Sequence, residues 1–357
     1  MTGNPRARML VVGVLLALFG ATPQVATACT AFLLTQNGSR VMGKSYDWHT
    51  AYGLLIANQR GVLKTAMVAP GPSAAKWTSR YGSLTFNQYG RELPLGGINE
   101  AGVAIEVLWY GGTQLPALDP KKPTLNELQL IQYLLDTSGD LPQLLTNLKR
   151  VQVQRAYAPV HYFACDAAGR CAAIEYTDGK LTINGDQHLA EPVLTNHGYT
   201  YSRLMLMAYK VFDRVARGQS SIDRFVRIAR HLGAKSQVDA VTRAFQLLAS
   251  VRTGSYTKWQ IVYDLTNKVV HFRLPAETRI LHVRVGGQMF ECGSPVRTLD
   301  LFGSVDPLRR QVWQTWREEL NARLIRQSFS RLSNPLPDKV LRQLIAYPRT
   351  TRCAPKR

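Results

Sequence analysis

The chain has 357 residues, of which 45% are hydrophobic and 19% are charged. This balance is typical of a folded globular protein and excludes a largely disordered one. The formal net charge is +20, with much of the excess in about the last fifty residues. A solvated basic face is our interpretation, with attraction to anionic envelope lipid or polymer as the alternative. Basic and aromatic residues do not alternate as in proteins that bind single-stranded nucleic acid, so we expect no nucleic-acid partner.

The first 28 residues have the pattern of a signal peptide. Arg6 and Arg8 precede an apolar stretch, residues 9–19, and the small-residue segment Ala26-Thr27-Ala28 comes directly before Cys29. The stretch is shorter than the roughly 20 residues that a membrane-spanning helix needs. We therefore expect cleavage after residue 28, a periplasmic or secreted protein and no stable insertion into a membrane.

The rest of the chain predicts sheets first, then helices, then sheets and helices again. Asn37-Gly38 indicates a hairpin between strands at 31–34 and 40–43. Thr124 and Glu127 fit a capping box at the start of a helix over 125–135. The patterns predict further strands at 54–57, 84–86, 103–108, 161–164, 172–176, 180–183, 260–264, 269–273 and 280–285. They predict further helices at 141–148, within 201–248 and at 307–326 and 339–345.

This grouping favours an α+β fold in which helices cover packed sheets. We expect one catalytic domain over residues 29–300 and a basic helical C-terminal extension over residues 301–357.

Five cysteines follow the cleavage site, and an oxidising compartment would favour disulfides between them. Cys165 and Cys171 flank a turn, and Cys292 and Cys353 could pair to hold the C-terminal segment. This pairing leaves Cys29 as the odd thiol, although spacing alone does not determine connectivity.

Cleavage after Ala28 would give Cys29 a free α-amine beside its thiol. The amine titrates near pH 8 and the thiol near pH 8.5, so the amine can accept the thiol proton. One residue then supplies the nucleophile and the base for attack on an amide carbonyl. Two alternatives are a lipoprotein of the envelope, lipidated at Cys29, and a purely structural cysteine. Lipidation requires leucine three residues before the cysteine, where this chain has Ala26.

The residues after the cleavage site carry a family resemblance. Cys29-Thr30-Ala31-Phe32 and Gly43-Lys44-Ser45-Tyr46-Asp47-Trp48 resemble the start of the choloylglycine hydrolase family, which includes bile salt hydrolases and penicillin V acylases. The resemblance implies that Asp47 holds the amine of the nucleophilic cysteine. Lys44 falls where bile salt hydrolases carry arginine, and it keeps the charge without the planar fork.

Three later segments extend the resemblance in chain order. Gly97-Ile98-Asn99-Glu100-Ala101-Gly102 leads to Trp109, Leu194-Thr195-Asn196 follows, and Asp223-Arg224-Phe225 comes last. The family places the residue at Trp109 near the oxyanion hole, uses the asparagine at Asn196 as an oxyanion donor and has the arginine at Arg224 near the nucleophile. The structural alternatives are core packing for Trp109, a strand-end cap for Asn196, a helix-face charge for Arg224 and a turn residue at Asp47.

The resemblance implies an αββα sandwich of the N-terminal nucleophile hydrolase type, and a hydrolase of linear carbon–nitrogen bonds that acts on a small acyl amide. Penicillin V and N-acyl homoserine lactones are the expected substrates, with bile salts as the alternative. We expect no cofactor and no metal, because no ligand spacing is present. The sequence leaves open whether the protein forms a homo-oligomer.

Overall fold

The structure is a computed structural model that describes residues 28–69, 73–185, 189–275, 279–301, 312–332 and 336–355. Apart from Ala28, the predicted signal peptide therefore lies outside the described residues.

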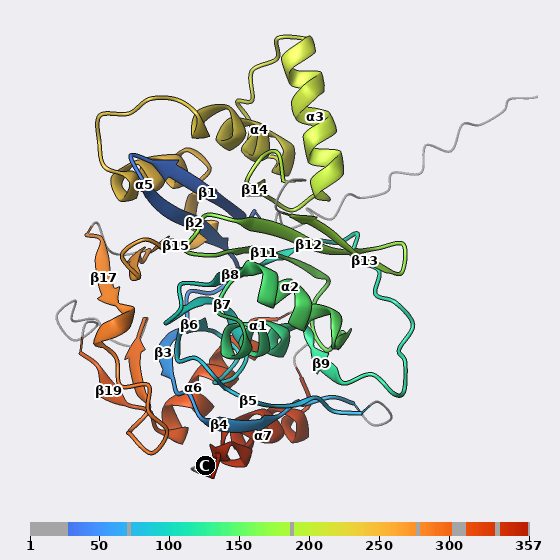
Figure 1. The fold of residues 1–357 in the computed structure, drawn as a ribbon, viewed down its shortest axis with the longest axis vertical. Coiled ribbons are helices and arrows are strands. Elements are labelled where there is room, and N and C mark those ends of the chain that lie inside the picture. The colour runs from blue at the N-terminus through green and yellow to red at the C-terminus, as the bar shows by residue number, and fades with distance from the viewer. Residues whose placement is uncertain are drawn as a thin grey trace, which may run out of the picture.

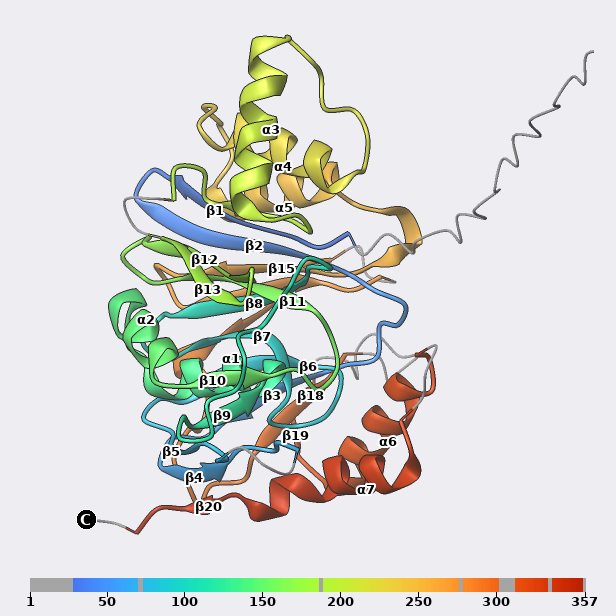
Figure 2. The ribbon, with the colours of Figure 1, turned by 90° about the vertical axis from the view of Figure 1, so that its right-hand side faces the viewer.

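Two antiparallel sheets stack face to face at the centre of the molecule (Figures 1 and 2). The six-stranded sheet has the order β14 (Val193–Leu194), β1 (Thr30–Gln36), β2 (Ser39–Asp47), β15 (Thr257–Asp264), β16 (Val269–Arg273) and β17 (Leu281–Arg284). The nine-stranded sheet has the order β13 (Lys180–Gly185), β12 (Cys171–Thr177), β11 (Val160–Cys165), β8 (Ala104–Trp109), β7 (Pro94–Asn99), β6 (Ser83–Asn87), β3 (Leu54–Asn58), β18 (Arg297–Asp300) and β19 (Gln314–Thr315).

Helices cover the outer faces of both sheets. Helices α4 (Ser221–Leu232) and α5 (Ala240–Ser250) pack on the six-stranded sheet, while α3 (Tyr199–Val211) packs on α4 and projects from the top of the molecule in Figure 1. Helix α1 (Glu127–Thr137) packs on β7 and β8, with α2 (Leu141–Lys149) beside it. These layers form the αββα arrangement that the family resemblance implies.

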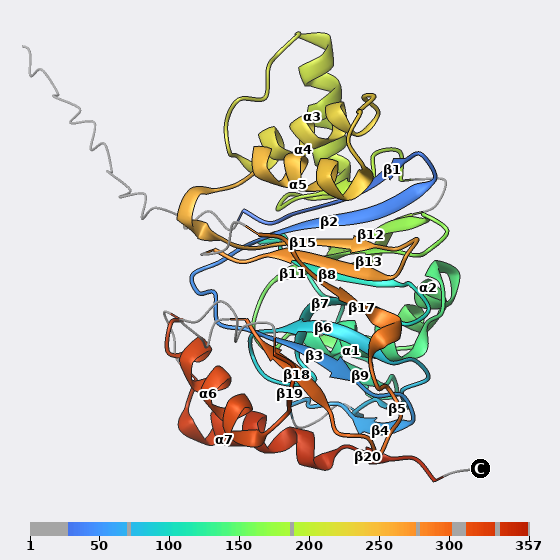
Figure 3. The same ribbon diagram turned by 90° about the vertical axis from the view of Figure 1, so that its left-hand side faces the viewer.

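Smaller elements lie at the opposite end from α3. Strand β9 (Thr124–Asn126) pairs with β10 (Gln152–Gln154), and a three-stranded sheet has the order β20 (Arg352–Cys353), β4 (Val62–Thr65) and β5 (Lys76–Thr78). Helices α6 (Glu318–Phe329) and α7 (Asp338–Ala346) lie there too (Figure 3). Short 3₁₀ turns occur at Gly254–Tyr256, Val285–Gly287 and Tyr347–Thr350.

The β1–β2 hairpin places the start of β1 beside the end of β2. Asn37 and Gly38 have φ values of 50° and 77°, as the two central residues of a tight hairpin require. The register pairs Thr30 with Ser45, so Cys29 and Asp47 lie at the same end of the sheet. Both strands are largely buried because α4 and α5 cover one face and the second sheet covers the other.

The predicted helix start at Thr124 is wrong. Thr124 belongs to β9, which pairs with β10, and the cap of α1 is Asn126, whose side chain accepts hydrogen bonds from the backbone of Leu128 and Gln129. Glu127 does not close a capping box. Its carboxylate instead accepts the backbone N–H groups of residues 156–158.

The predicted helix over 307–326 is correct only in its second half. Residues 307–311 lie outside the described residues, and Gln314 and Thr315 form β19, which adds to the edge of β18. The helix begins at Glu318. The buried side of the C-terminal helices joins the main core through Ile325, Phe329 and Leu344, so the segment packs on the same core as residues 29–300.

Both predicted disulfide pairings are confirmed. Cys165–Cys171 joins β11 to β12 across a six-residue separation, and Cys292–Cys353 ties the C-terminal strand to the body of the molecule. Cys29 is a free thiol. Within the described ranges, no helix combines the length and apolar character needed to cross a bilayer.

Candidate active site

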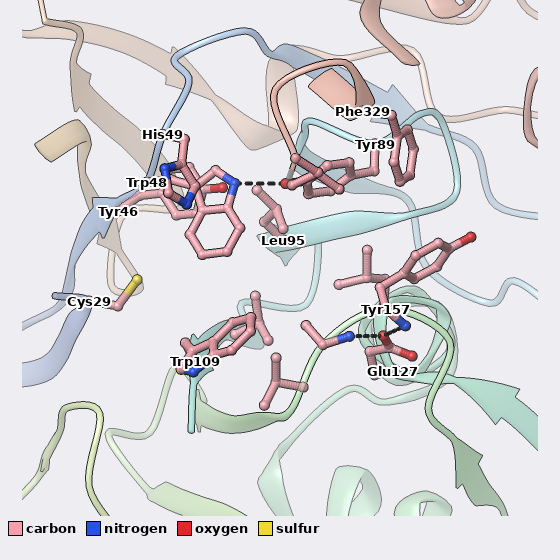
Figure 4. A pocket seen from close by; sticks show the side chains of 15 residues that line it. Cys29, Tyr46, Trp48, His49, Tyr89, Leu95, Trp109, Glu127, Tyr157 and Phe329 are labelled. Atoms are coloured by element: carbon pink, nitrogen blue, oxygen red, sulfur yellow. Dashed lines mark hydrogen bonds between the residues drawn. The ribbon is translucent and has the colours of Figure 1, made fainter. Parts of the chain in front are cut away.

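Cys29 lies at one end of a cavity of about 330 Å³ (Figure 4). Only 3% of the residue is exposed to solvent. Most of the side chains around the cavity are aromatic or aliphatic, and they come from both sheets, from α1 and from the C-terminal segment. The lining consists of Cys29, Tyr46, Trp48, His49, Tyr89, Leu95, Val107, Trp109, Glu127, Leu128, Tyr157, Ala158, Val160, Phe329 and Leu332.

Asp47 lies beside Cys29 at the end of β2. The Cys29 thiol is 3.9 Å from the carbonyl oxygen of Asp47. The Asp47 carboxylate accepts hydrogen bonds from Thr257 and, at 2.9 Å, from Ser45. Burial raises the pKa of this carboxyl above its ordinary value, while the hydrogen bond from Thr257 lowers it. The two hydroxyl donors thus hold a buried carboxylate next to the backbone of Cys29.

The predicted cleavage site lies directly before Cys29. The nitrogen of Cys29 is a peptide nitrogen bonded to Ala28, and it stands where cleavage would create the α-amine. Burial raises the pKa of the Cys29 thiol above its ordinary value, and the charge of Lys44 acts in the opposite direction. Burial thus disfavours the thiolate form of Cys29, and a neighbouring base would favour it.

Arg224 binds the backbone around Cys29 from the first turn of α4. Ser220 caps this helix, and Arg224 is almost fully buried where the helix meets β1. Its Nη1 donates to the carbonyl oxygens of Ala28 and, at 2.6 Å, Cys29, and to the Thr30 hydroxyl at 2.6 Å. Burial lowers the pKa of the guanidinium to about 10, so it stays charged at neutral pH.

Asn196 lies between Arg224 and Trp109. Its Oδ1 accepts from Arg224 Nη2 at 2.8 Å, which identifies the other side-chain atom as Nδ2, and Nδ2 donates one hydrogen to the carbonyl oxygen of Trp109 at 2.8 Å. The backbone nitrogen of Asn196 donates to Ser221 Oγ at 2.9 Å. With its orientation set in this way, Asn196 Nδ2 has a second amide hydrogen that it can donate to another acceptor.

His161 helps to fix the same segment. Its Nε2 lies 2.7 Å from the carbonyl oxygen of Thr195, and its Nδ1 lies 2.9 Å from Glu175. The Glu175 carboxylate also accepts the backbone N–H of Tyr199 at the start of α3. His161 and Glu175 therefore connect the Asn196 segment to β11 and β12.

Trp109 contributes its ring to the cavity and its backbone to Asn196. The ring centroids of Trp48 and Trp109 are 5.9 Å apart, and Trp48 Nε1 donates to the Tyr89 hydroxyl at 2.7 Å. The cavity thus has aromatic walls on both sides of Cys29, which suits a flat or apolar substrate group.

Lys44 does not line the cavity. It is fully buried between the sheets, where Nζ donates to the carbonyl oxygen of Val107 and lies 3.6 Å from Glu106. Tyr263 donates to the same carboxylate. Gly96 makes room for it, because a Cβ at residue 96 would overlap the Glu106 carboxylate. Burial raises the pKa of Glu106 to about 7, and the charge of Lys44 opposes this shift.

The structure thus brings five of the six candidate residues, Cys29, Asp47, Trp109, Asn196 and Arg224, together at one end of the two sheets, and it places Lys44 behind them. Sequence reasoning missed Trp48, Tyr89, Tyr157, Phe329, Glu106, Glu175 and Ser221. Of these, only Trp48 lies within one of the short segments on which the family resemblance rests. Among the described residues, no cluster of histidine, cysteine, aspartate or glutamate could hold a metal ion.

Residues 29–298 match the sequence profile of linear amide C–N hydrolases of the choloylglycine hydrolase family. The match covers most of the chain, so the protein belongs to this family, and the predicted resemblance is confirmed. Cys29, the expected nucleophile, is the first residue of the family domain.

Individual relatives agree with this assignment. A penicillin V acylase from Pectobacterium atrosepticum is 30% identical over 250 residues, which are 63% of this chain and 65% of that protein. The chain thus spans slightly less than two thirds of that relative's length. The structure of a penicillin V acylase from Agrobacterium tumefaciens superposes with a TM-score of 0.70 at 23% identity, covering 81% of this chain and 98% of that one.

A more distant structure shares the same fold. A conjugated bile acid hydrolase from Clostridium perfringens superposes with a TM-score of 0.63 at 15% identity, covering 76% of this chain and 96% of that one. The predicted α+β fold of the N-terminal nucleophile hydrolase type is therefore confirmed.

Proposed function

We propose that this protein is a cysteine amidase that hydrolyses a linear acyl amide through an acyl-thioester on Cys29, after removal of residues 1–28. The observation that carries the proposal is the position of Cys29. It is the first residue of the family domain, and its free thiol opens on an apolar cavity beside Asp47, Arg224 and Asn196.

The geometry supports a two-step reaction. The α-amine of Cys29, held beside Asp47, takes the thiol proton, and the sulfur forms a bond to the amide carbonyl carbon. Asn196 Nδ2 donates to the oxyanion as the carbonyl double bond opens. The carbon–nitrogen bond then breaks, and the leaving amine takes the proton from the α-ammonium. Water gives a proton to the α-amine and attacks the thioester, which releases the acid and restores the thiol.

Arg224 supports this chemistry without taking part in proton transfer. Its guanidinium binds the Cys29 carbonyl oxygen and the Asn196 side chain, so one planar group sets the distance between nucleophile and oxyanion donor. Its positive charge also favours the thiolate over the thiol.

The aromatic cavity favours an acyl group that is flat or apolar. The phenoxyacetyl group of penicillin V fits this description, and the name of the Pectobacterium relative supports it. Fatty-acyl groups, as in N-acyl homoserine lactones, fit the apolar walls as well. The small-molecule substrate that the family implies would then be an acyl amide of this type.

We propose a periplasmic or secreted location, which the signal-peptide pattern and the two disulfides support. We also propose a homo-oligomer. Its support is the exposed side of α3 and the turn after it, where Tyr201, Leu204, Met207, Val211, Phe212 and Val215 are 50–77% exposed. Soluble monomers seldom expose an apolar surface of this kind, and an identical copy could bury it.

Intact mass and N-terminal sequencing of the protein from its native host test the proposal first. We expect a free cysteine at residue 29. A diacylglyceryl adduct, or a chain that starts elsewhere, would contradict it. The processed protein is then offered penicillin V, N-acyl homoserine lactones and a glycine-conjugated bile salt. Preference for the bile salt would favour a bile salt hydrolase over the proposed acylase. No turnover of any acyl amide would refute the proposed amidase function.

A further inference from the structure

Part of the cavity wall opposite Cys29 comes from outside the region that matches the family profile. Phe329, the last residue of α6, and Leu332 just after it both line the cavity. The family match ends at residue 298. Figure 4 shows Phe329 and Tyr89 at the far end of the cavity from Cys29, with Tyr157 on the same side.

Phe329 forms an aromatic end wall with two residues of the family domain. Its ring centroid is 4.9 Å from that of Tyr89 and 5.8 Å from that of Tyr157. Phe329 is 1% exposed, so the ring is enclosed by the protein on its other sides. Removing the ring would therefore extend the cavity away from Cys29.

Helix α6 also positions the segment that carries Tyr89. Asn321 Oδ1 accepts the backbone N–H of Arg91 at 2.9 Å. Gly90 has a φ of 115°, and a Cβ there would lie 2.9 Å from Ile325 Cδ1. The helix thus packs directly on the backbone beside Tyr89, which only glycine permits at residue 90.

The other side of the end wall is held from within the family domain. The Glu127 carboxylate accepts the backbone N–H groups of Ala156, Tyr157 and Ala158 at 2.5–2.8 Å. These bonds occupy the carboxylate, although Glu127 contributes to the cavity lining. This end of the cavity is consequently suited to an apolar group rather than to a cation.

The C-terminal segment is fastened at several points. The Cys292–Cys353 disulfide and the pairing of β20 with β4 hold its end. The Tyr347 hydroxyl donates to the carbonyl oxygen of Thr65 at 2.8 Å, and Arg349 binds Glu318 of α6 at 2.6 Å. A wall held in this way can exclude a substrate that is too long.

We propose that α6 closes the substrate cavity and that Phe329 and Leu332 limit the length of the acyl group. The reacting carbonyl lies at Cys29, and the far end of an apolar acyl chain meets the α6 wall. This inference rests on the proposed function in one respect: the acyl part of the substrate, and not its amine part, enters the cavity.

Hydrolysis of a series of N-acyl homoserine lactones, with straight acyl chains of four to twelve carbons, tests the inference. In Phe329→Ala we expect the preferred chain to lengthen and kcat/KM for the longest chains to rise about tenfold relative to the shortest, since each added methylene in an apolar pocket is worth about that factor. In Leu332→Trp, kcat/KM for the longest acyl chains should fall about tenfold, and kcat/KM for the shortest chains should stay unchanged.

Leu344→Ala is the matched control, because Leu344 lies buried in α7 of the same segment and does not line the cavity. It should leave the chain-length preference as in the wild type, and thermal unfolding of each variant shows whether it folds. The inference is overturned if Phe329→Ala and Leu332→Trp both fold and each changes kcat/KM by the same factor for every chain length. A shift in Leu344→Ala equal to that in Phe329→Ala would overturn it too.

Binding separates this inference from the proposed function. Free fatty acids of the same lengths are titrated into the Cys29→Ser variant, with and without Phe329→Ala, and followed by tryptophan fluorescence, since Trp48 and Trp109 line the cavity. If the wild type hydrolyses none of the lactones, the amidase proposal fails on that series. The binding data still test whether α6 limits the length of the acyl chain. If the variant with Phe329→Ala prefers longer fatty acids, the result supports the α6 wall. If both variants bind the fatty acids with the same dependence on chain length, the result refutes it.

Discussion

The Cys29 thiol is buried, and its burial works against ionisation. The charges of Lys44 and Arg224 favour the thiolate, while the buried Asp47 carboxylate favours the thiol. The proposed attack by Cys29 therefore requires a base, and the proposed α-amine would supply one within the same residue. This dependence separates the mechanism from one in which a low thiol pKa alone would be sufficient.

Cys29→Ser should fold and lose activity. We expect kcat to fall at least about 1,000-fold, because removal of a nucleophile costs more than removal of an oxyanion donor. A serine hydroxyl is far harder to ionise than a thiol at neutral pH. The measurement is kcat on the best acyl amide, with N-terminal sequencing to verify that the mature variant begins with the substituted serine. Substantial remaining turnover would contradict thiol attack.

Glu106 should make stability depend on pH. Its folded pKa of about 7 lies above the ordinary value of 4.5, so the native state keeps a proton that the unfolded chain has released. Its stabilising contribution is thus full below about pH 4.5 and is lost as the pH rises through 7. Relative to Glu106→Gln, which keeps an acceptor for Tyr263, the wild type should lose roughly 3 kcal/mol of unfolding free energy across this range.

Urea unfolding at a series of pH values measures this difference. Glu319→Gln removes an equal charge from an exposed site on α6, and its stability should follow the wild type at every pH. Parallel curves for the wild type and Glu106→Gln would show that Glu106 titrates at the same pH in the folded and unfolded chains.

At the scale of elements, the contact of α4 with β1 aligns the site. Arg224→Lys keeps the charge and loses the fork that binds the Cys29 carbonyl oxygen and Asn196 together. We expect kcat to fall about 100-fold, the cost of a misplacement of about 1 Å, with a smaller change in KM. Arg227→Lys on the same helix is the control, since Arg227 binds carbonyl oxygens of Ala216, Gly218 and Ser250, away from Cys29. Equal losses in both variants would assign Arg224 a structural role only.

Helix α3 should form the contact between copies. Leu204→Glu combined with Val211→Glu places charges on its exposed apolar side and should convert the oligomer to monomers, because a buried unpaired charge is costly. Sedimentation velocity measures the mass. Lys210→Glu, on the same helix, should keep the oligomer. A wild type that already sediments as a monomer would disprove the contact.

At the scale of the whole molecule, the two disulfides close chain segments of different length. Cys292–Cys353 spans 61 residues and Cys165–Cys171 spans six. Replacing the first pair by alanine should cost roughly 4 kcal/mol and the second roughly 2 kcal/mol, if loop entropy dominates. Thermal unfolding of the two double variants shows which disulfide contributes more stability. A larger loss of stability without Cys165–Cys171 would show that packing outweighs chain entropy.

Much of this architecture can be predicted from sequence because local signals are strong. Asn37-Gly38 fixes a hairpin, and the ordered segments from Cys29 to Arg224 give the family and the α+β fold. The end wall of the cavity could not be predicted, because Tyr89, Tyr157 and Phe329 meet only through tertiary packing. Glu127 shows the same limit, since its spacing suits a capping box while its buried position makes it an acceptor for a distant loop.

An end wall supplied by α6 has a consequence for how such enzymes can diversify. The residues around Cys29 come from β1, β2 and α4, while Phe329 and Leu332 come from a segment beyond the family match. If α6 closes the cavity as proposed, mutation or exchange of the C-terminal segment would alter which acyl groups are accepted and leave the proposed catalytic residues unchanged. Two lineages with the same nucleophile and oxyanion donor could diverge in substrate range simply by inheriting different C-terminal segments.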